Sequence, residues 1–132
     1  MISKEKLVGI VGTANVQFDS ATLDAYSRDI SFVNQMRPAF VVKPANAEQV
    51  QKIVSLANET MTPLVPISSG SPHFRGDTVP SAGGAVVVDL RKMNKVIFVD
   101  RPRRVAMVEP GVTFAELIPD SMGSTGHSRH VL

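Results

Sequence analysis

Short apolar runs flank one amphipathic segment near the middle of the chain. Residues 39–42 and 64–67 are short, continuous apolar stretches of the kind that form buried strands. Between them, Asn46 is a good N-cap, with Gln49 three residues later, for a helix that ends near residue 60. The apolar residues at helical spacing in this segment are Val50, Ile53, Val54 and Ala57. A strand, a capped helix and a second strand predict a βαβ unit with parallel strands.

Further elements follow the same logic on both sides of this unit. In chain order we expect a helix that is capped by Ser3 and ends near Val11, a short helix at 21–26, a strand at 85–90, a hairpin of 95–99 with 105–108, and a helix capped by Thr113 with Glu116 at its third position. The pattern predicts an α/β (α+β) fold in which a small mixed sheet is flanked by helices. We expect an N-terminal helical arm at 1–20, a main subdomain at 21–119 and a flexible tail at 120–132.

Composition narrows the functional classes. The chain has 132 residues, 43% of them apolar, and a formal net charge of +2, which suits a soluble globular domain and argues little for nucleic acid. Without cysteine, disulfides, thiolate catalysis and cysteine-ligated metal sites are excluded. Residues 7–16 follow two lysines but suit a surface helix better than a signal sequence, so we expect a cytoplasmic protein.

The stretch at 66–76 carries the clearest chemistry. It is rich in glycine and serine and lies between two predicted buried strands, where backbone N–H groups can form an anion-binding nest. The Gly-Lys-Ser/Thr ending of a P-loop is missing, which argues against an NTPase. Neither Ser69 nor Ser71 has an activating base at identifiable spacing, so a nucleophilic serine is not expected.

Several longer motifs stand around this loop in a fixed order. They are Tyr26-Ser27-Arg28-Asp29, Arg37-Pro38, Val41-Val42-Lys43-Pro44, Pro63-Leu64-Val65-Pro66, the stretch from Val87 to Lys95, and Val108-Glu109-Pro110-Gly111-Val112-Thr113. Together, over residues 23–117, they resemble the first half of the PCMH-type FAD-binding domain of the vanillyl-alcohol oxidase and para-cresol methylhydroxylase family. The resemblance implies the first lobe of an FAD site. The family's second FAD lobe and substrate domain have no counterpart in the chain.

The resemblance also implies which residues hold the cofactor. The loop would surround the FAD pyrophosphate, and the turn at 110–112 would approach from the neighbouring side. The expected cofactor-binding residues are Ile67, Ser68, Ser69, Gly70, Ser71, Pro72, His73, Gly76, Pro110, Gly111 and Val112. In members that bond FAD to a histidine, that histidine would fall at Pro72. His73 is displaced by one residue, so the resemblance implies noncovalent FAD, and His73 is expected to make a local hydrogen bond or face solvent.

Three functional hypotheses remain open. The first is the FAD-binding portion of a flavin-dependent oxidoreductase, which takes hydride from an alcohol or a phenolic C–H and is incomplete as a catalyst alone. The second is a non-catalytic truncated or structural module, for which we expect a homo-oligomer or a partner subunit that covers the exposed half-site. The third is a subunit of a split flavoenzyme whose second lobe is encoded separately. No catalytic residue is assigned. Asp89 and Glu109 could face the cofactor or serve turns, and His127 and His130 could hold a metal only if the tail were helical.

Overall fold

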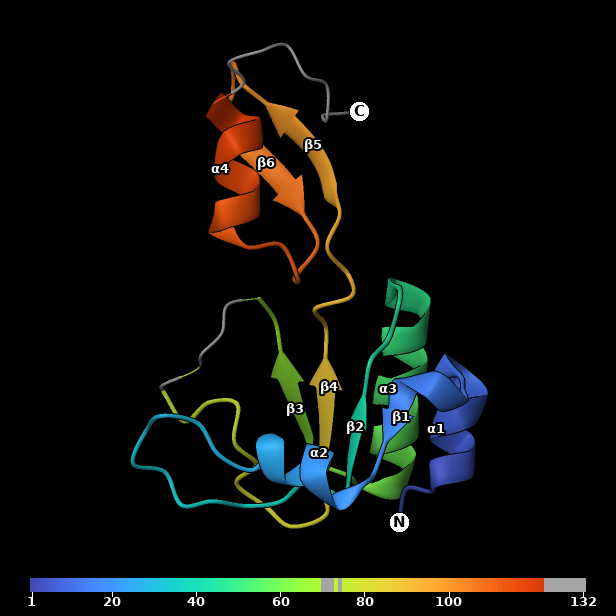
Figure 1. Ribbon diagram of the computed structural model, residues 1–132. Helices are drawn as coiled ribbons and strands as arrows, with labels where there is room; N and C mark the ends of the chain where they lie inside the picture. Colours follow the sequence, from blue (N-terminus) through green and yellow to red (C-terminus); the bar gives the residue numbers. More distant parts are fainter. Residues whose placement is uncertain (70–72, 74, 123–132) are drawn as a thin grey trace.

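A four-stranded sheet forms the body of the molecule, and a two-stranded hairpin stands beyond one end of it (Figure 1). This computed structural model describes residues 1–69, 73 and 75–122, with the backbone alone for 119–122. The elements are α1 (Lys4–Val11), η1 (Thr13–Asn15), β1 (Val16–Gln17), α2 (Ser20–Ala25), β2 (Phe40–Val42), α3 (Ala47–Thr60), β3 (Leu64–Ile67), β4 (Val86–Asp89), β5 (Val96–Asp100), β6 (Val105–Val108) and α4 (Phe114–Met122).

The main sheet has the strand order β1-β2-β4-β3. Both β2 and β3 run parallel to β4, which lies between them, and β1 pairs with β2 in the antiparallel sense. The predicted βαβ unit and the mixed sheet are therefore confirmed, with β4 inserted between the two strands of the unit. The two-residue strand β1 was not predicted, because it is too short to show an alternating pattern.

Both faces of the sheet are covered. Successive side chains of a strand point to opposite faces, so Val86 and Val88 of β4 join a core cluster with residues of α1 and α3. Val87 joins a second cluster with Leu23 of α2 on the other face. This two-sided burial explains why β4 reads as a continuous apolar run rather than an alternating one.

The helix caps follow the sequence closely. The Asn46 side chain accepts a hydrogen bond from the Gln49 N–H at 2.9 Å, and it starts α3 as expected. One helix position differs from the prediction: Val54 is 44% exposed, whereas Leu56 is buried in the core. In α1, Leu7 and Val11 are buried, so this helix packs against the main sheet. The expected division of the chain at residues 20 and 119 stays a prediction.

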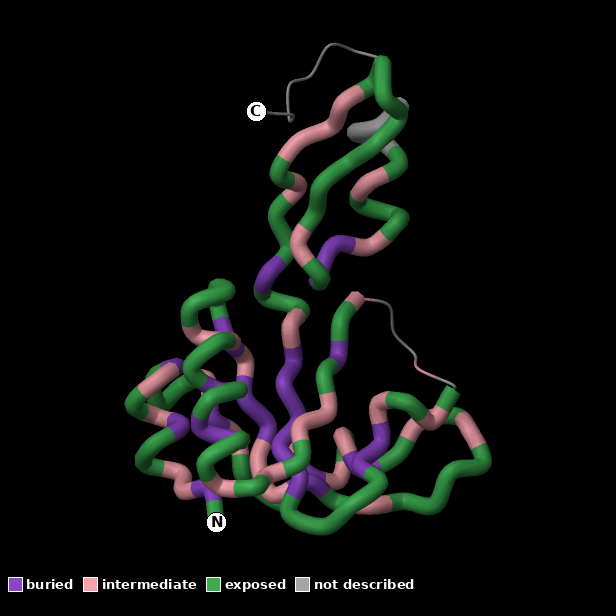
Figure 2. Tube along the Cα trace, turned by 180° about the vertical axis from the view of Figure 1, so that it is seen from behind, coloured by how far each residue is buried: buried purple, intermediate pink, exposed green. Residues whose placement is uncertain are grey.

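The unit formed by β5, β6 and α4, called here the hairpin unit, has little core of its own. No side chain from Asn94 to Val108 is buried, and the purple of Figure 2 is concentrated in the main sheet. The predicted hairpin is confirmed, and so is the Thr113 cap, whose hydroxyl accepts from the Glu116 N–H at 3.2 Å.

The last helix continues beyond its expected end. It passes Pro119 and reaches Met122, because a proline removes only its own N–H donor and later residues can still bond one turn back. Residues 123–132 of the expected tail, with His127 and His130, lie outside the described residues. Within the part of the chain that the structure describes, no helix has both the length and the apolar character needed to cross a bilayer.

Candidate cofactor site

The candidate site lies where the parallel strands end. β3 ends at Ile67 and β4 at Asp89, and these two residues are paired in the register of the sheet. The carboxyl ends of adjacent parallel strands share one edge, which is where open α/β sheets bind ligands. The predicted cofactor loop, called loop 68–76 below, leaves the sheet at this edge.

The near end of loop 68–76 meets the second predicted stretch. The Ser69 N–H donates to the Pro110 carbonyl at 3.0 Å, so the two segments, which are far apart in the chain, are hydrogen-bonded to each other. The Gly111 N–H in turn donates to the Met93 carbonyl at 2.7 Å. A Cβ on Gly111 would lie 2.6 Å from the Arg91 carbonyl oxygen, so this close approach requires glycine.

The far end of the loop is fixed by a different segment. The Gly76 N–H donates to Asp29 Oδ2 at 2.6 Å, and the Ile30 N–H donates to the His73 carbonyl at 3.0 Å. Gly70, Ser71 and Pro72 lie outside the described residues. The loop is therefore held at both ends by residues that lie outside it.

These contacts change the expected roles of several residues. The backbone N–H groups of Ser69, Gly76, Gly111 and Val112 all donate to protein acceptors. They frame the site and are not available to a phosphate in this arrangement. Among the described residues, the side chains that could meet a ligand include the exposed Ser68 and the half-buried Ser69 and His73.

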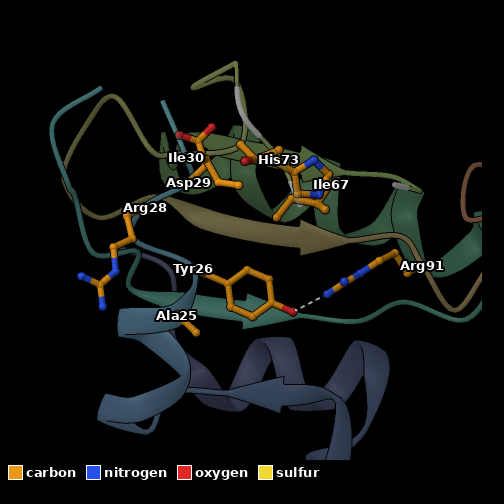
Figure 3. Close-up of a pocket in the computed structure, with 9 residues that line it drawn as sticks. Ala25, Tyr26, Arg28, Asp29, Ile30, Ile67, His73 and Arg91 are labelled. Atoms are coloured by element: carbon orange, nitrogen blue, oxygen red, sulfur yellow. Dashed lines mark hydrogen bonds between the residues drawn. The ribbon is translucent and has the colours of Figure 1, made fainter. Parts of the chain in front are cut away.

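A cleft of about 490 Å³ opens beside the loop (Figure 3). Its volume falls in the range of roughly 300–1,000 Å³ that is common for small-molecule sites. Tyr26, Ile67, His73 and Arg91 line it, together with Arg28 and Asp29 of the segment after α2. The cleft joins the end of β3 to the Tyr26–Asp29 motif.

A network of three charged or polar side chains forms one wall of this region. The Tyr26 hydroxyl donates to Asp89 Oδ2 at 2.5 Å. It also accepts from Arg91 Nη2 at 3.0 Å, the bond drawn in Figure 3. Arg91 also donates to both oxygens of Asp89, at 2.9 Å from Nε and 2.6 Å from Nη2. Asp89 is only 2% exposed, so its charge is compensated inside the protein.

The network shifts the ionisation of its members. Burial alone would raise the pKa of Asp89, but hydrogen bonds from Arg91 and Tyr26 outweigh burial and lower that pKa below its ordinary value. Burial, with the hydrogen bond to Asp89, raises the pKa of Tyr26 to about 12. Tyr26 is therefore a neutral hydrogen-bonding residue at neutral pH and is poorly suited to act as a base.

The His73 side chain is half-buried, and the two alternatives expected for it stay a prediction. Its Nε2 is buried and has no hydrogen-bond partner among the described residues. Buried polar atoms are nearly always paired, so an unpaired imidazole nitrogen beside a cleft indicates a missing partner. An anionic, hydrogen-bonding cofactor fits this nitrogen and the neighbouring Arg91 guanidinium.

Other candidates have structural roles. A carboxylate oxygen of Glu109 accepts from the Lys95 N–H at 2.9 Å, so Glu109 ties the base of the hairpin. In the turn between β5 and β6, Arg103 Nε lies 3.7 Å from Asp100 Oδ2, and this ion pair belongs to a solvent-exposed turn. The described residues contain no cluster of three His, Cys, Asp or Glu side chains that could hold a metal.

The loop at the carboxyl edge of the sheet and the adjoining cleft define a nucleotide-cofactor-binding α/β domain. The chain belongs to the FAD binding domain family, whose model matches residues 38–120. It is 36% identical over 115 residues to the flavoprotein subunit of 4-cresol dehydrogenase (hydroxylating) from Pseudomonas putida, covering 86% of this chain and 22% of that protein. The glycolate oxidase subunit GlcD of Bacillus subtilis is 31% identical over 115 residues, covering 87% of this chain and 24% of GlcD.

A solved structure agrees with these sequence relatives. The crystal structure of p-cresol methylhydroxylase with substrate bound matches with a TM-score of 0.80 and 34% identity, covering 89% of this chain and 23% of that one. The predicted family, the fold and FAD as the cofactor are thereby confirmed. The chain spans about a quarter of the length of these relatives.

Sequence reasoning missed two parts of the site. It placed Tyr26 in a family motif without giving its hydroxyl a partner, whereas that hydroxyl is hydrogen-bonded to Asp89 and Arg91. It also gave Asp29 no role, although Asp29 contacts the loop. The only signal for either was membership of a family motif, because both contacts join residues more than forty positions apart in the chain.

Proposed function

We propose that this chain is the FAD-binding portion of a flavin-dependent oxidoreductase and that it is incomplete as a catalyst on its own. The observation that carries the proposal is the hydrogen bond between the Ser69 N–H and the Pro110 carbonyl. It brings together the two segments that family resemblance assigns to the cofactor, beside a cleft that contains an unpaired buried His73 nitrogen.

The residues divide into a frame and a contact surface. Pro110 and Gly76 take part in the hydrogen bonds that hold the two loop ends, Gly111 and Val112 fix the turn after Pro110, and Ile67 lines the cleft. The FAD pyrophosphate would be contacted by the Ser68 and Ser69 hydroxyls and by His73. Residues 70–72, which lie outside the described residues, are expected to contact it as well. Bound FAD would supply a hydride acceptor for a substrate alcohol or phenolic C–H, while the chain binds and orients it.

We further propose that the binding is noncovalent, because Pro72 stands at the position where the family members that bond FAD carry a histidine. The test is a titration of the purified chain with FAD, followed by acid precipitation. We expect saturable binding and release of all flavin into the supernatant. Flavin that stays with the precipitate would refute noncovalent binding, and absence of saturation would refute the proposal.

A pair of variants at Ser69 isolates the hydrogen bond. Ser69→Pro removes the backbone donor to Pro110, whereas Ser69→Ala keeps that donor and removes only the hydroxyl. We expect Ser69→Pro to weaken FAD binding by about tenfold or more, and Ser69→Ala by about threefold, in line with one lost hydrogen bond. Equal losses in the two variants would contradict the framing role.

The second candidate function is a non-catalytic module that associates through the hairpin unit. Val105 is 49% exposed, Met107 51% and Phe114 79%, which leaves an apolar surface without cover in the described chain. On this candidate, a second copy or a partner subunit covers that surface. Sedimentation velocity tests this candidate, and we expect a dimer whose fraction rises with protein concentration. Met107→Lys should weaken the dimer, whereas the control Gln51→Lys, at an exposed position of α3, should not. A monomer at all concentrations, with no binding of a hydrophobic dye, would contradict it.

A cytoplasmic location is also proposed, and it rests on the sequence alone. Fractionation of cells that produce the tagged chain would test it, with recovery outside the cytoplasm as the contrary result.

A further inference from the structure

Asp29 joins the loop to a separate part of the chain. Its Oδ2 accepts from the Gly76 N–H at 2.6 Å, and the next residue, Ile30, donates its N–H to the His73 carbonyl at 3.0 Å. Two consecutive residues of the segment after α2 therefore bond to His73 and Gly76 at the far end of loop 68–76. Among the described side chains, Asp29 alone accepts a hydrogen bond from the Gly76 backbone N–H.

Both carboxylate oxygens of Asp29 are occupied. While Oδ2 accepts from Gly76, Oδ1 accepts from the Ser31 N–H at 2.8 Å and from the Ser31 hydroxyl. Hydrogen bonds from Ser31, with smaller contributions from Gly76 and the nearby His73, lower the pKa of Asp29 despite some desolvation. The residue is thus ionised at neutral pH, and its bonds to N–H donors are charge-assisted.

Gly76 is fitted to this contact. Its φ is +79°, a conformation that other residues rarely adopt, and a Cβ there would lie 2.2 Å from Val33 Cγ2. The backbone can therefore reach Asp29 only because residue 76 is glycine.

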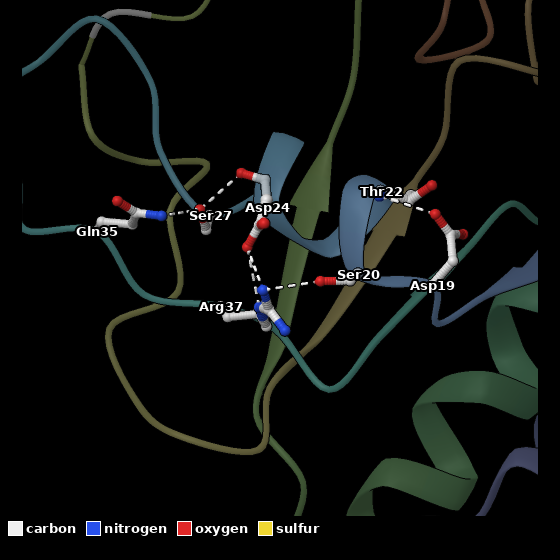
Figure 4. Close-up of polar contacts among 7 residues, drawn as sticks. All are labelled: Asp19, Ser20, Thr22, Asp24, Ser27, Gln35 and Arg37. Atoms are coloured by element: carbon white, nitrogen blue, oxygen red, sulfur yellow. Dashed lines mark hydrogen bonds and ion pairs between the residues drawn. The ribbon is translucent and has the colours of Figure 1, made fainter.

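The segment that presents Asp29 is itself braced (Figure 4). The buried Ser27 hydroxyl donates to the Asp24 carbonyl at 2.6 Å and accepts from Gln35 Nε2 at 2.9 Å. Arg37 donates through Nε to Asp24 Oδ1 at 3.0 Å, which closes the segment onto α2. Asp29 therefore projects from a loop with fixed ends rather than from a free one.

We propose that Asp29 is a positioning residue that fixes the far end of the cofactor loop, as the Pro110 carbonyl fixes the near end. The inference rests on the proposed function, because it assigns Asp29 an effect on FAD binding. Asp29 acts through Gly76, while the N–H of the neighbouring Ile30 holds the His73 carbonyl.

The test compares Asp29→Asn with two controls in the full chain. In Asn an NH2 group replaces one carboxylate oxygen, so Asp29→Asn cannot accept from Ser31 and Gly76 through two separate oxygens as the carboxylate does. Asp19→Ala removes the N-cap of α2, where Asp19 accepts from the Thr22 N–H at 2.9 Å, and lowers stability without touching the loop. Ser31→Ala removes the contact from the Ser31 hydroxyl but leaves the bond to Gly76.

Two measurements are made: the Kd for FAD, well below the melting temperature, and the hydrogen exchange rate of the Gly76 amide without FAD. We expect Asp29→Asn to raise the Kd about tenfold and to speed Gly76 exchange, whereas Asp19→Ala and Ser31→Ala stay within about threefold of the unmodified chain. If Asp29→Asn does not fold, Asp29→Glu, which keeps both oxygens on a longer stem, should give a smaller loss in the same direction.

The outcomes separate the two proposals. Unchanged FAD affinity in Asp29→Asn, with normal binding by the unmodified chain, overturns the inference alone. An equal loss in Asp19→Ala also overturns it, because the effect would then follow stability. If the unmodified chain does not bind FAD, the proposed function fails together with the effect assigned to Asp29, although faster Gly76 exchange would still establish the contact.

Discussion

Gly111→Ala should loosen the junction between the main sheet and the hairpin unit. The added methyl group would lie 2.6 Å from the Arg91 carbonyl oxygen and 2.8 Å from that of Met93. Both neighbours are backbone atoms, so neither can move aside by a change of rotamer. Relief requires a shift of residue 111 away from the turn after β4, which breaks the 2.7 Å hydrogen bond from its N–H to Met93.

The expected cost follows from these two effects. Forcing a methyl group into a packed site costs about 1–3 kcal/mol, and one lost backbone hydrogen bond adds about 1 kcal/mol. The free energy of unfolding should therefore fall by about 2–4 kcal/mol. For a domain of this size, a few degrees are lost per kcal/mol, so the melting temperature should fall by roughly 10 °C.

Thermal unfolding followed by circular dichroism measures the effect, and Gly83→Ala is the matched control. A Cβ on Gly83 has no heavy atom within 4 Å, so that variant should melt within about 2 °C of the unmodified chain. FAD affinity should fall in Gly111→Ala as well, because Pro110 precedes the displaced residue. A Gly111→Ala protein with unchanged melting temperature and unchanged FAD affinity would show that the contact with the turn after β4 is not tight.

Three further predictions concern other parts of the molecule. Gly9→Ala, at an exposed position of α1 with open space around the added methyl group, should raise stability by about 0.5–1 kcal/mol in chemical unfolding, and a loss would contradict the helix boundary. Tyr26 is the only tyrosine and tryptophan is absent, so absorbance at the phenolate band should titrate near pH 12 in the folded chain and near 10 in urea. Because the pKa of Tyr26 is higher in the folded chain than in the unfolded chain, the protonated Tyr26 hydroxyl contributes its full stabilisation of the fold below pH 10, and this contribution is lost towards pH 12. A titration midpoint near pH 10 in the folded chain would refute the hydrogen-bond network of Tyr26. The effect of pH on the Asp89 contribution is opposite: because the pKa of Asp89 is lowered in the folded chain, its ionised side chain stabilises the fold above pH 3.8, and this contribution is lost as the pH falls below that value. Acid unfolding measures it: the free energy of unfolding of Asp89→Asn should depend less on pH in this range than that of the unmodified chain.

Local patterns were sufficient to predict most of the fold. The caps of α1, α3 and α4 rely on residues within one turn of each other, so Ser3, Asn46 and Thr113 could be recognised directly. The apolar run of β4 likewise reflects burial on both sides of a single strand. Val54 was wrongly predicted to face the core. The apolar side of the helix is broad enough for either Val54 or Leu56 to face the sheet, and only the packing against β4 decides between them.

The site depended on contacts that periodicity does not encode. Tyr26 meets Asp89 and Arg91 across 63 and 65 positions, and Asp29 meets Gly76 across 47. Family motifs indicated that these segments belong together, without indicating which atoms join them. The role of the loop amides was also hidden: glycine and serine suggested free N–H donors, whereas Ser69 and Gly76 use theirs to hold the loop.

On the proposed function, the two ends of the loop differ in what supports them. The far end is bonded to Asp29, in a segment braced by Ser27, which is fully buried. The near end is bonded to Pro110, which follows β6, a strand with every residue exposed. A second copy or a partner subunit bound to the hairpin unit would therefore stabilise the near end of loop 68–76. Thermodynamic linkage then requires that bound FAD favour this association by the same free energy. Association and cofactor binding are thus expected to strengthen each other through Pro110, while Asp29 keeps the far end in place in either state.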